Sequence, residues 1–219
     1  MALGHRGEAG GEVVALGSGP ALRRAILGGT FDPPHVGHLI VAEAVRSTLG
    51  LDEVVFVPAG SPPHKRARPL TPALHRVMMV QLAIASNPAF SLSLVDINRP
   101  GPHYAVESVA LLHAAWGTSE APYYIVGADS LRDLPTWHRP HELIARCWIV
   151  AVERPGVRVD VSALERALPG IGRRLLWVPA PTVGVSSTEI RRRAARGDPI
   201  RYLVPEGVEA YIHEHGLYR

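Results

Sequence analysis

From residue 24 onward, short uninterrupted apolar runs alternate with segments in which apolar residues recur every three or four positions. The uninterrupted runs predict buried β-strands, and the three-to-four spacing predicts amphipathic helices. Gly50 follows one such helical segment directly, as expected of a residue that ends a helix. The predicted strands are 25–27, 53–57, 90–95, 123–126, 148–152 and 175–178, and the predicted helices are 39–49, 73–86, 105–116, 187–196 and 205–215.

Strands that alternate with helices predict parallel β-α-β units with right-handed crossovers. Because the strands are continuously apolar, we expect helices to cover both faces of the sheet. The predicted fold class is therefore α/β, with a doubly wound, mainly parallel sheet and a helical C-terminal portion. Such sheets bind ligands beyond the carboxyl ends of their strands, so the residues that follow each strand are the candidate site.

The first 23 residues carry scattered glycines and little apolar periodicity, so we expect 1–23 to be a disordered leader and 24–219 to be one domain. The formal charge of +3 gives no sign of nucleic-acid binding, and no apolar run has the length of a membrane span. The leader lacks the features of a secretory signal. Cys147, the lone cysteine, lies in an apolar run and is interpreted as a packed thiol in a reducing, cytoplasmic compartment.

The segment 28–38 joins the first strand to a helix and contains Gly28, Gly29, His35 and His38. Glycines allow close approach of a ligand to the backbone, and the N–H groups of a helix start attract phosphate. The two histidines, three residues apart, can both face one site. A plain turn and a zinc site are the alternatives, but neither explains a glycine pair directly after a strand. We therefore favour phosphate binding.

The segment 28–38 resembles the signature of the HxGH nucleotidyltransferase superfamily in its nicotinate-nucleotide adenylyltransferase form, and the likeness extends over 24–219. The resemblance implies a Rossmann-like fold and catalytic roles for His35 and His38, which bind and polarise the phosphates of ATP. It also implies that Gly28, Gly29, Thr30 and Phe31 form part of the ATP site.

A proline-rich loop after the second strand contains Lys65, the only lysine of the chain. Taken alone, the loop is a rigid turn with an exposed cation. It resembles the family's Pro-Pro-His-Lys segment, in which the basic residue lies near the triphosphate. We therefore expect Lys65 to stabilise negative charge on the phosphoryl oxygens.

A third motif, 185–191, begins a helix. Ser186 and Glu189 have the spacing of a capping box, which is a structural reading that needs no ligand. The motif also resembles the family's Ile-Ser-Ser-Thr-x-Ile-Arg segment, which grips the β and γ phosphates of ATP. That resemblance implies phosphate-binding roles that are compatible with the cap, for Ser186, Ser187, Thr188 and Arg191.

The expected mononucleotide site lies after the strand 123–126. Trp137 is either a loop side chain folded onto the core or, by resemblance, the residue that stacks on the pyridine ring. By the same resemblance Asp129 lies near ribose hydroxyls. The family usually has Ser-Tyr-Thr where this chain has His103-Tyr104-Ala105, so Ala105 lacks a hydroxyl implicated in holding the nicotinate carboxylate. Backbone N–H groups near Tyr104, Ala105 and His138 are the expected substitutes.

The implied reaction is adenylyl transfer from ATP to nicotinate mononucleotide in NAD biosynthesis, which releases pyrophosphate, with Mg²⁺ bridging phosphate oxygens. Nicotinamide mononucleotide as a main or co-substrate, and a pantetheine-phosphate type of transfer, are alternatives within the superfamily. An ATP-binding sensor without turnover and a zinc-dependent hydrolase built on the two histidines are alternatives of other classes. A homo-oligomer is compatible with the sequence.

Overall fold

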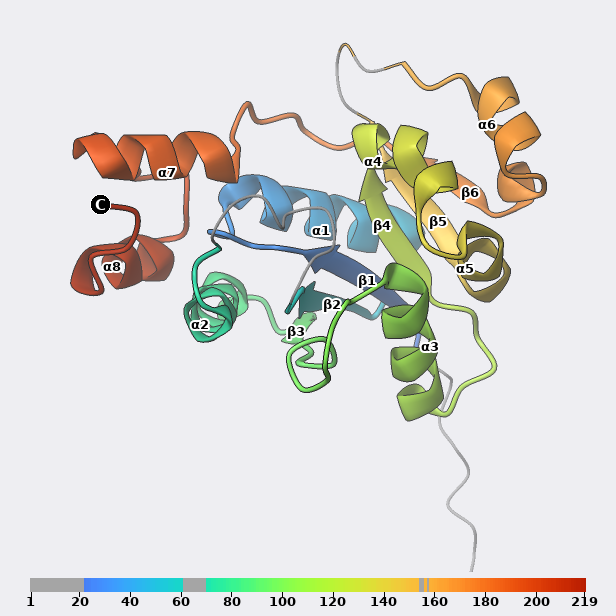
Figure 1. The fold of residues 1–219 in the computed structure, drawn as a ribbon, viewed down its shortest axis with the longest axis horizontal. Helices are drawn as coiled ribbons and strands as arrows, with labels where there is room; N and C mark the ends of the chain where they lie inside the picture. Colours follow the sequence, from blue (N-terminus) through green and yellow to red (C-terminus); the bar gives the residue numbers. More distant parts are fainter. Residues whose placement is uncertain (1–21, 61–69, 154–155, 157) are drawn as a thin grey trace, which may run out of the picture.

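The computed structural model describes residues 22–60, 70–153, 156 and 158–219, and Figure 1 shows their arrangement. The described residues contain one sheet in which all strand pairs are parallel, in the order β3-β2-β1-β4-β5-β6. The strands are β1 (Arg24–Gly29), β2 (Glu53–Pro58), β3 (Phe90–Leu92), β4 (Tyr123–Gly127), β5 (Trp148–Val152) and β6 (Leu175–Val178). The helices are α1 (Val36–Leu49), α2 (Ala73–Ile84), α3 (Ala105–Trp116), α4 (Ala128–Asp133), α5 (Pro140–Arg146), α6 (Val161–Ala167), α7 (Ser187–Arg196) and α8 (Glu206–Glu214), with 3₁₀ turns η2 (Leu134–Thr136) and η3 (Ile171–Arg173).

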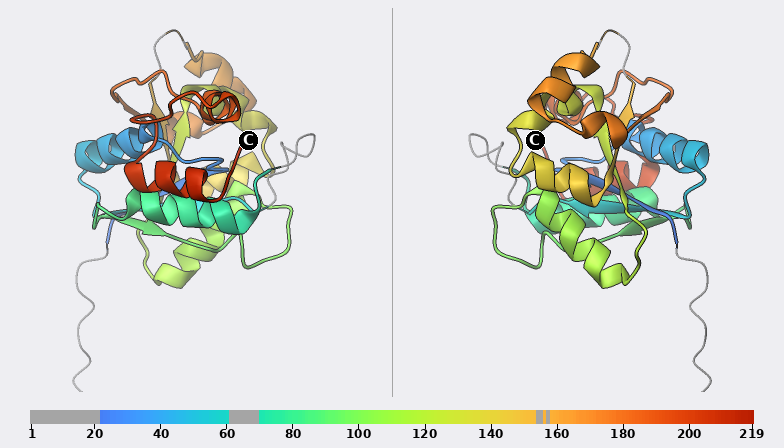
Figure 2. Two further views of the ribbon diagram at one scale, coloured as in Figure 1. Left: turned by 90° about the vertical axis from the view of Figure 1, so that its left-hand side faces the viewer. Right: turned by 90° about the vertical axis from the view of Figure 1, so that its right-hand side faces the viewer.

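Helices cover both faces of the sheet, as the apolar strands predict. Neighbouring residues of a strand point to opposite faces, so Leu27 packs in the cluster formed with α1 and α2, whereas Ile26 packs in the cluster formed with α3, α4, α5 and α6. A third cluster joins α2 to α7 and α8 through side chains such as Met79, Ile190 and Ile212. Figure 2 shows α8 lying alongside α2, away from the sheet edge that carries β6.

The structure confirms the predicted fold class, and most predicted elements agree with it to within two residues. Gly50 ends α1 in the left-handed conformation, with φ of 59°. The predicted strand 90–95 is too long, because β3 ends at Leu92 and residues 95–97 turn. The sequence patterns did not indicate the short helices α4, α5 and α6.

The predicted leader lies outside the described residues except at its end. Arg23, which we had assigned to the leader, donates from its backbone N–H to the Asp52 carboxylate at 2.7 Å and from its guanidinium to the Tyr123 hydroxyl at 2.9 Å. The folded part therefore includes Arg23. Among the described helices, none combines the length and the apolar character needed to span a membrane.

The topology selects one place for a ligand. The chain runs outward from β1 to β2 and β3, and then returns to the other side of β1 as β4, β5 and β6. The strand order therefore reverses between β1 and β4, and a doubly wound sheet binds ligands outside the carboxyl ends of its strands at such a point.

Candidate active site

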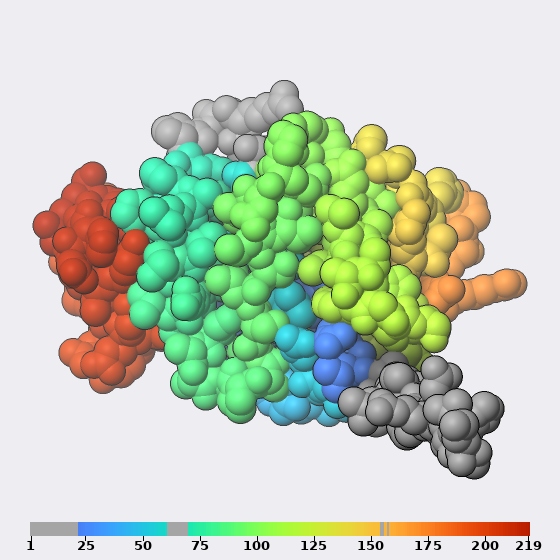
Figure 3. Space-filling model, turned by 90° about the horizontal axis from the view of Figure 1, so that it is seen from below, coloured from blue at the N-terminus to red at the C-terminus, as the bar shows by residue number. Residues whose placement is uncertain are grey.

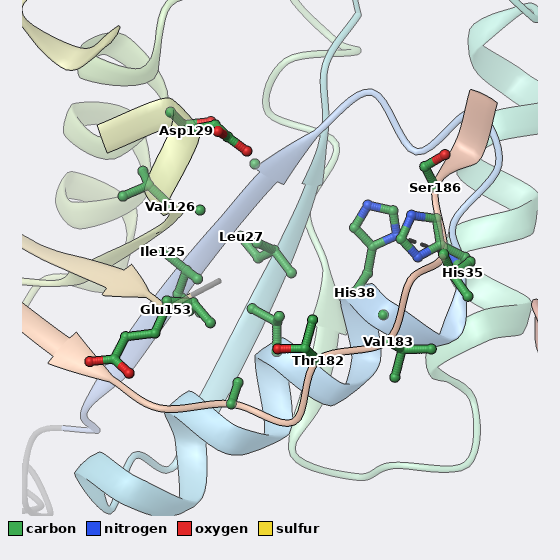
Figure 4. Close-up of a pocket in the computed structure, with 18 of the residues that line it drawn as sticks. Leu27, His35, His38, Ile125, Val126, Asp129, Glu153, Thr182, Val183 and Ser186 are labelled. Atoms are coloured by element: carbon green, nitrogen blue, oxygen red, sulfur yellow. Dashed lines mark hydrogen bonds between the residues drawn. The ribbon is translucent and has the colours of Figure 1, made fainter. Parts of the chain in front are cut away.

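A cleft of about 320 Å³ lies at the carboxyl ends of β1 and β4. Its walls come from α1, from the end of β5 and from the segment that leads into α7. Figure 4 shows His35, His38 and Ser186 on one side of the cleft, with Asp129 and Glu153 on the other. The cleft therefore coincides with the point of strand reversal.

His35 and His38 stand together at the beginning of α1. Their rings are stacked, with centroids 3.7 Å apart and planes inclined by 25°. The backbone N–H of His35 donates to Nδ1 of His38 at 3.1 Å, so a neutral His38 ring carries its proton on Nε2. The residue between them in the motif, Gly37, leaves space for the His35 ring, because a Cβ at this position would lie only 3.0 Å from that ring. The predicted histidine pair is thus one compact unit that lines the cleft.

The glycine pair that ends β1 is required by close contacts. A Cβ at Gly28 would lie 2.8 Å from the hydroxyl of Tyr124, and a Cβ at Gly29 would lie 2.9 Å from the ring of Phe31. Phe31 itself is buried with φ of 50°, and its ring meets the edge of His38 at a centroid distance of 5.0 Å. Phe31 therefore supports His38 from behind instead of lining the cleft.

The N-terminus of α7 forms the wall beside the histidines. Ser186 caps the helix and accepts a hydrogen bond from the Glu189 backbone N–H at 3.2 Å. The capping box is nevertheless only half formed, because the Glu189 carboxylate pairs with Arg192 and Arg193. Ser186 and Ser187 both line the cleft. Capping leaves the first-turn N–H groups near the cleft, where they favour an anion.

Two side chains of α7 fix this helix to the loop that carries the histidines. The Ser187 hydroxyl donates to the Pro33 carbonyl at 2.8 Å, and the Arg191 guanidinium donates to the Asp32 carbonyl at 2.6 Å. Arg191 also donates to the hydroxyl of Thr188 at 3.0 Å. The residues that line the cleft do not include Thr30, Thr188 or Arg191, and Lys65 lies outside the described residues. Their phosphate-binding roles stay predictions.

The residues predicted to bind the mononucleotide gather on the α3 and α4 side. Asp129, in the first turn of α4, and Trp137 line the cleft, and Trp137 meets the Tyr124 ring edge-on at a centroid distance of 6.2 Å. Tyr104 precedes α3 and stacks on His138 at 4.0 Å. Ala105, the first residue of α3, borders a second and smaller chamber.

This chamber, of about 80 Å³, lies on the α3 face of the sheet and shares Gly28 and Tyr124 with the cleft. Buried Asp96 lines it and accepts hydrogen bonds from the Ser108 hydroxyl at 2.7 Å and the Arg99 guanidinium at 2.9 Å. The sequence reasoning did not find Tyr124 or Asp96. The only available signal for Tyr124 was its place in a strand two residues before Val126, which puts both on one face.

Arg76 is a second residue that the motif analysis missed. Its side chain is 1% exposed and donates to the carbonyls of Thr30, Ala59, Gly60 and Thr71 at 2.7–3.2 Å. Burial lowers the pKa of this guanidinium, which stays protonated because the pKa of arginine is so high. Arg76 therefore holds the ends of β1 and β2 and the start of α2 together beneath the cleft.

The C-terminal segment also reaches the histidine loop. The hydroxyl of Tyr218 donates to the carboxylate of Asp32, which is 3% exposed, at 2.8 Å. Together with the bonds from α7, this contact anchors residues 32 and 33. Among the described residues, no group of three or more His, Cys, Asp or Glu side chains is placed to hold a metal ion, so the third ligand of a zinc site is not found there.

Comparison with known proteins agrees with the motifs. The sequence model of the cytidylyltransferase-like family matches residues 26–193. A protein named probable nicotinate-nucleotide adenylyltransferase from Thermomicrobium roseum is 48% identical over 197 residues, which cover 90% of this chain and 92% of the relative. A protein of the same name from Roseiflexus sp. (strain RS-1) is 46% identical over 89% of this chain and 96% of its own length.

The fold has solved counterparts. The nicotinic acid mononucleotide adenylyltransferase of Plasmodium falciparum, solved in complex with NaAD, superposes with a TM-score of 0.70 at 20% sequence identity, over 90% of this chain and 97% of that one. The likeness confirms the Rossmann-like architecture. On the strength of the family model and of relatives that match it along most of their length, this chain belongs to the nicotinate-nucleotide adenylyltransferase family of cytidylyltransferase-like proteins.

Proposed function

We propose that the chain transfers the adenylyl group of ATP to nicotinate mononucleotide, yielding nicotinate adenine dinucleotide and pyrophosphate. The observation that carries the proposal is the shared cleft. The stacked histidines and the N-terminus of α7 form one side, where an anion is favoured, and Asp129 lies on the other. Trp137, which packs against Tyr124 of β4, also lines the cleft. The names of the relatives and the complex of the Plasmodium protein with NaAD support the choice of acceptor.

The reaction is one in-line displacement. An oxygen of the mononucleotide 5′-phosphate attacks the α-phosphorus, a new P–O bond forms, and the bond to the α,β-bridging oxygen breaks as pyrophosphate departs with the electron pair. Both reactants already carry their charges, so the protein supplies positioning and charge stabilisation. No covalent intermediate on the protein is required.

Within this scheme the groups on the α7 side act on the triphosphate. His38 offers its Nε2–H, because Nδ1 is occupied by the His35 amide. Ser186, Ser187 and the first-turn N–H groups of α7 bind the β and γ phosphates, assisted by Arg191 and Lys65. Mg²⁺ would be held mainly by the phosphate oxygens of ATP and would neutralise their charge, because this ion prefers such oxygens and keeps much of its water.

On the opposite side, the Trp137 ring offers a flat apolar surface to the pyridine, and Asp129 accepts hydrogen bonds from the ribose hydroxyls. Because Ala105 carries no hydroxyl, nicotinamide mononucleotide is the second acceptor to consider. A cytoplasmic site of action accords with the single cysteine, because a chain with one cysteine forms no internal disulfide. Assembly into a homo-oligomer stays a prediction.

The test is pyrophosphate release by the purified chain with ATP and Mg²⁺. Nicotinate mononucleotide, nicotinamide mononucleotide and phosphopantetheine are offered in separate reactions. We expect release with nicotinate mononucleotide and formation of the dinucleotide. Release only with phosphopantetheine would reassign the acceptor, and ATP binding without release in any reaction would favour the sensor.

A further inference from the structure

The small chamber behind β1 provides a place for the substituent of the pyridine ring. It adjoins the cleft through Gly28 and Tyr124, and Ala105 forms part of its wall. Its volume of about 80 Å³ is several times the ~10–15 Å³ that one water needs, and too small for a nucleotide. It therefore fits a carboxylate or carboxamide that projects from a ring held in the cleft. Figure 3 shows the chain between about residues 90 and 130, which includes α3, on the face of the molecule that is seen from below.

Most of the polar side chains around the chamber already have partners. The Ser108 hydroxyl donates to Asp96, and Arg99 forms an ion pair with the same carboxylate at 2.9 Å. The His103 ring contacts the Arg99 carbonyl through Nε2 at 3.0 Å. Arg99 also pairs with Glu107 at 2.8 Å, and Glu107 pairs in turn with Arg139 at 3.4 Å, so two guanidinium groups balance the two carboxylates.

Tyr124 differs from these residues. Its ring packs in the apolar cluster under α3, and its hydroxyl reaches the surface of Gly28, where a Cβ would lie only 2.8 Å from it. Among the described residues this hydroxyl has no hydrogen-bond partner. Burial, together with the charge of Asp96, raises the pKa of Tyr124, so the group remains an O–H donor throughout the physiological range.

We infer that the Tyr124 hydroxyl donates a hydrogen bond to the substituent on the pyridine ring and favours the carboxylate over the carboxamide. In doing so it takes the place of the hydroxyl that Ala105 lacks. The inference rests on the proposed function, because it concerns the acceptor of the same reaction. A hydrogen bond to a charged acceptor is stronger than one to a neutral carbonyl, which gives the preference its sign.

The experiment compares kcat/KM for nicotinate mononucleotide and nicotinamide mononucleotide at saturating ATP. Tyr124→Phe removes only the hydroxyl and keeps the ring. We expect kcat/KM to fall about 10-fold or more for nicotinate mononucleotide and less than about 3-fold for nicotinamide mononucleotide. The ratio of the two kcat/KM values, acid to amide, should therefore decrease. The KM for ATP and the melting temperature should not change, since the hydroxyl has no partner among the described residues.

Two further variants separate recognition from packing. Tyr123→Phe makes the same chemical change one residue earlier in β4, where the hydroxyl accepts from Arg23, and should leave the acid-to-amide ratio unchanged. Ala105→Thr, introduced into the Tyr124→Phe protein, should restore part of the preference by returning a hydroxyl to the chamber wall.

The outcomes are distinct. An unchanged ratio in Tyr124→Phe, or an equal loss with both substrates, would overturn the inference while leaving the proposed function in place. A wild-type chain that is inactive with both mononucleotides would overturn the proposed function and this inference together.

Discussion

One backbone hydrogen bond determines which nitrogen of His38 is available to a substrate. Because the His35 N–H points at Nδ1, the His38 ring has a fixed orientation and presents Nε2–H as a donor. Phe31 packs against the same ring and limits its rotation. A donor that is fixed before the substrate arrives needs no reorganisation as charge develops, and such groups contribute most to transition-state stabilisation.

Replacement of His38 by alanine removes this donor. We expect kcat to fall on the order of 10²-fold or more, as for other charge-stabilising donors, while the fold persists. Steady-state pyrophosphate release and a thermal melt measure the two effects. His141→Ala, at an exposed histidine on α5, is the matched control and should change neither. Undiminished turnover in His38→Ala would remove the residue from the mechanism.

Arg76 acts at the same scale, but on stability. In Arg76→Met four carbonyls lose the charged donor that the buried guanidinium supplies, so the free energy of unfolding should drop by about 3 kcal/mol or more. Arg76→Lys should lose somewhat less, because a single ammonium cannot reach all four carbonyls. Urea unfolding measures both. The exposed Arg132–Asp133 pair supplies the control, and Arg132→Met should lower the free energy of unfolding by at most ~1 kcal/mol. An equal loss in Arg76→Met and Arg132→Met would contradict the stabilising role of Arg76.

At the scale of elements, the beginning of α7 combines two functions. Ser186 caps the helix, and its hydroxyl also lines the cleft. A helix end that is both well capped and close to the histidines can bind phosphate without a rearrangement. The capping role and the phosphate-binding role of Ser186 therefore predict different effects of substitutions at this position.

Glycine and alanine at position 186 separate the two functions. Both variants lack the hydroxyl, but glycine is a tolerable cap that costs only a few tenths of a kcal/mol, whereas alanine costs about 1 kcal/mol. If the hydroxyl binds phosphate, Ser186→Gly raises the KM for ATP as much as Ser186→Ala does, despite its smaller loss of stability. If the KM for ATP instead rises in proportion to the loss of unfolding free energy, so that it rises less in Ser186→Gly than in Ser186→Ala, then Ser186 acts only as a helix cap. Ser162→Ala, at an exposed position of α6, controls for removal of a hydroxyl elsewhere.

The elements that the sequence predicts well are those with a long enough pattern. Helices α3 and α7 complete three turns or nearly so, and the structure confirms their predicted bounds. Helices α4, α5 and α6 have 6 or 7 residues each, too few for an apolar repeat to distinguish them from loops. β3 was predicted too long because the apolar residues after Leu92 belong to a turn.

The site residues likewise fall into those that a sequence pattern predicts and those that it does not. Residues in contiguous motifs, such as His35, His38 and Ser187, were predicted, and the structure places them on one cleft. Tyr124 and Arg76 could not be assigned, because their importance depends on which strands lie side by side and on where the carbonyls of distant loops point. The sequence places Arg76 in a helix and Tyr124 in a strand, but it does not show the chamber or the carbonyl cluster.

At the scale of the whole molecule, α2, α8 and the C-terminal segment support the loop that carries the histidines. The third cluster packs α8 against α2, and Tyr218 extends from the end of the chain to Asp32. Burial raises the pKa of Tyr218 as well as that of Tyr124. A group whose pKa is higher in the folded state than in the unfolded state makes the free energy of unfolding depend on pH.

The sign of this dependence follows from the direction of the shifts. For Tyr124, Tyr218 and Cys147 the folded pKa exceeds the unfolded one, so the folded state binds more protons and stability falls as pH rises. For Cys147 the contribution is complete below the unfolded value of 9.0 and is lost as pH rises toward about 12. The tyrosines add to the loss above their unfolded value of 10.0. We therefore expect the urea midpoint of unfolding to be unaffected by these groups up to about pH 8.5 and to decline above 9.

Cys147→Ala identifies the thiol within this decline. Between pH 9 and 10 the free energy of unfolding should fall less steeply in the variant than in the wild-type chain, by at most ~1.4 kcal/mol per pH unit, the limit for one ionising group. The variant starts from a lower stability, because removal of a buried sulfur leaves a small void, so the slopes and not the absolute values are compared. Parallel slopes would mean that the thiol ionises as readily in the folded protein as in the unfolded one, which the buried position of Cys147 against the Leu143 carbonyl argues against.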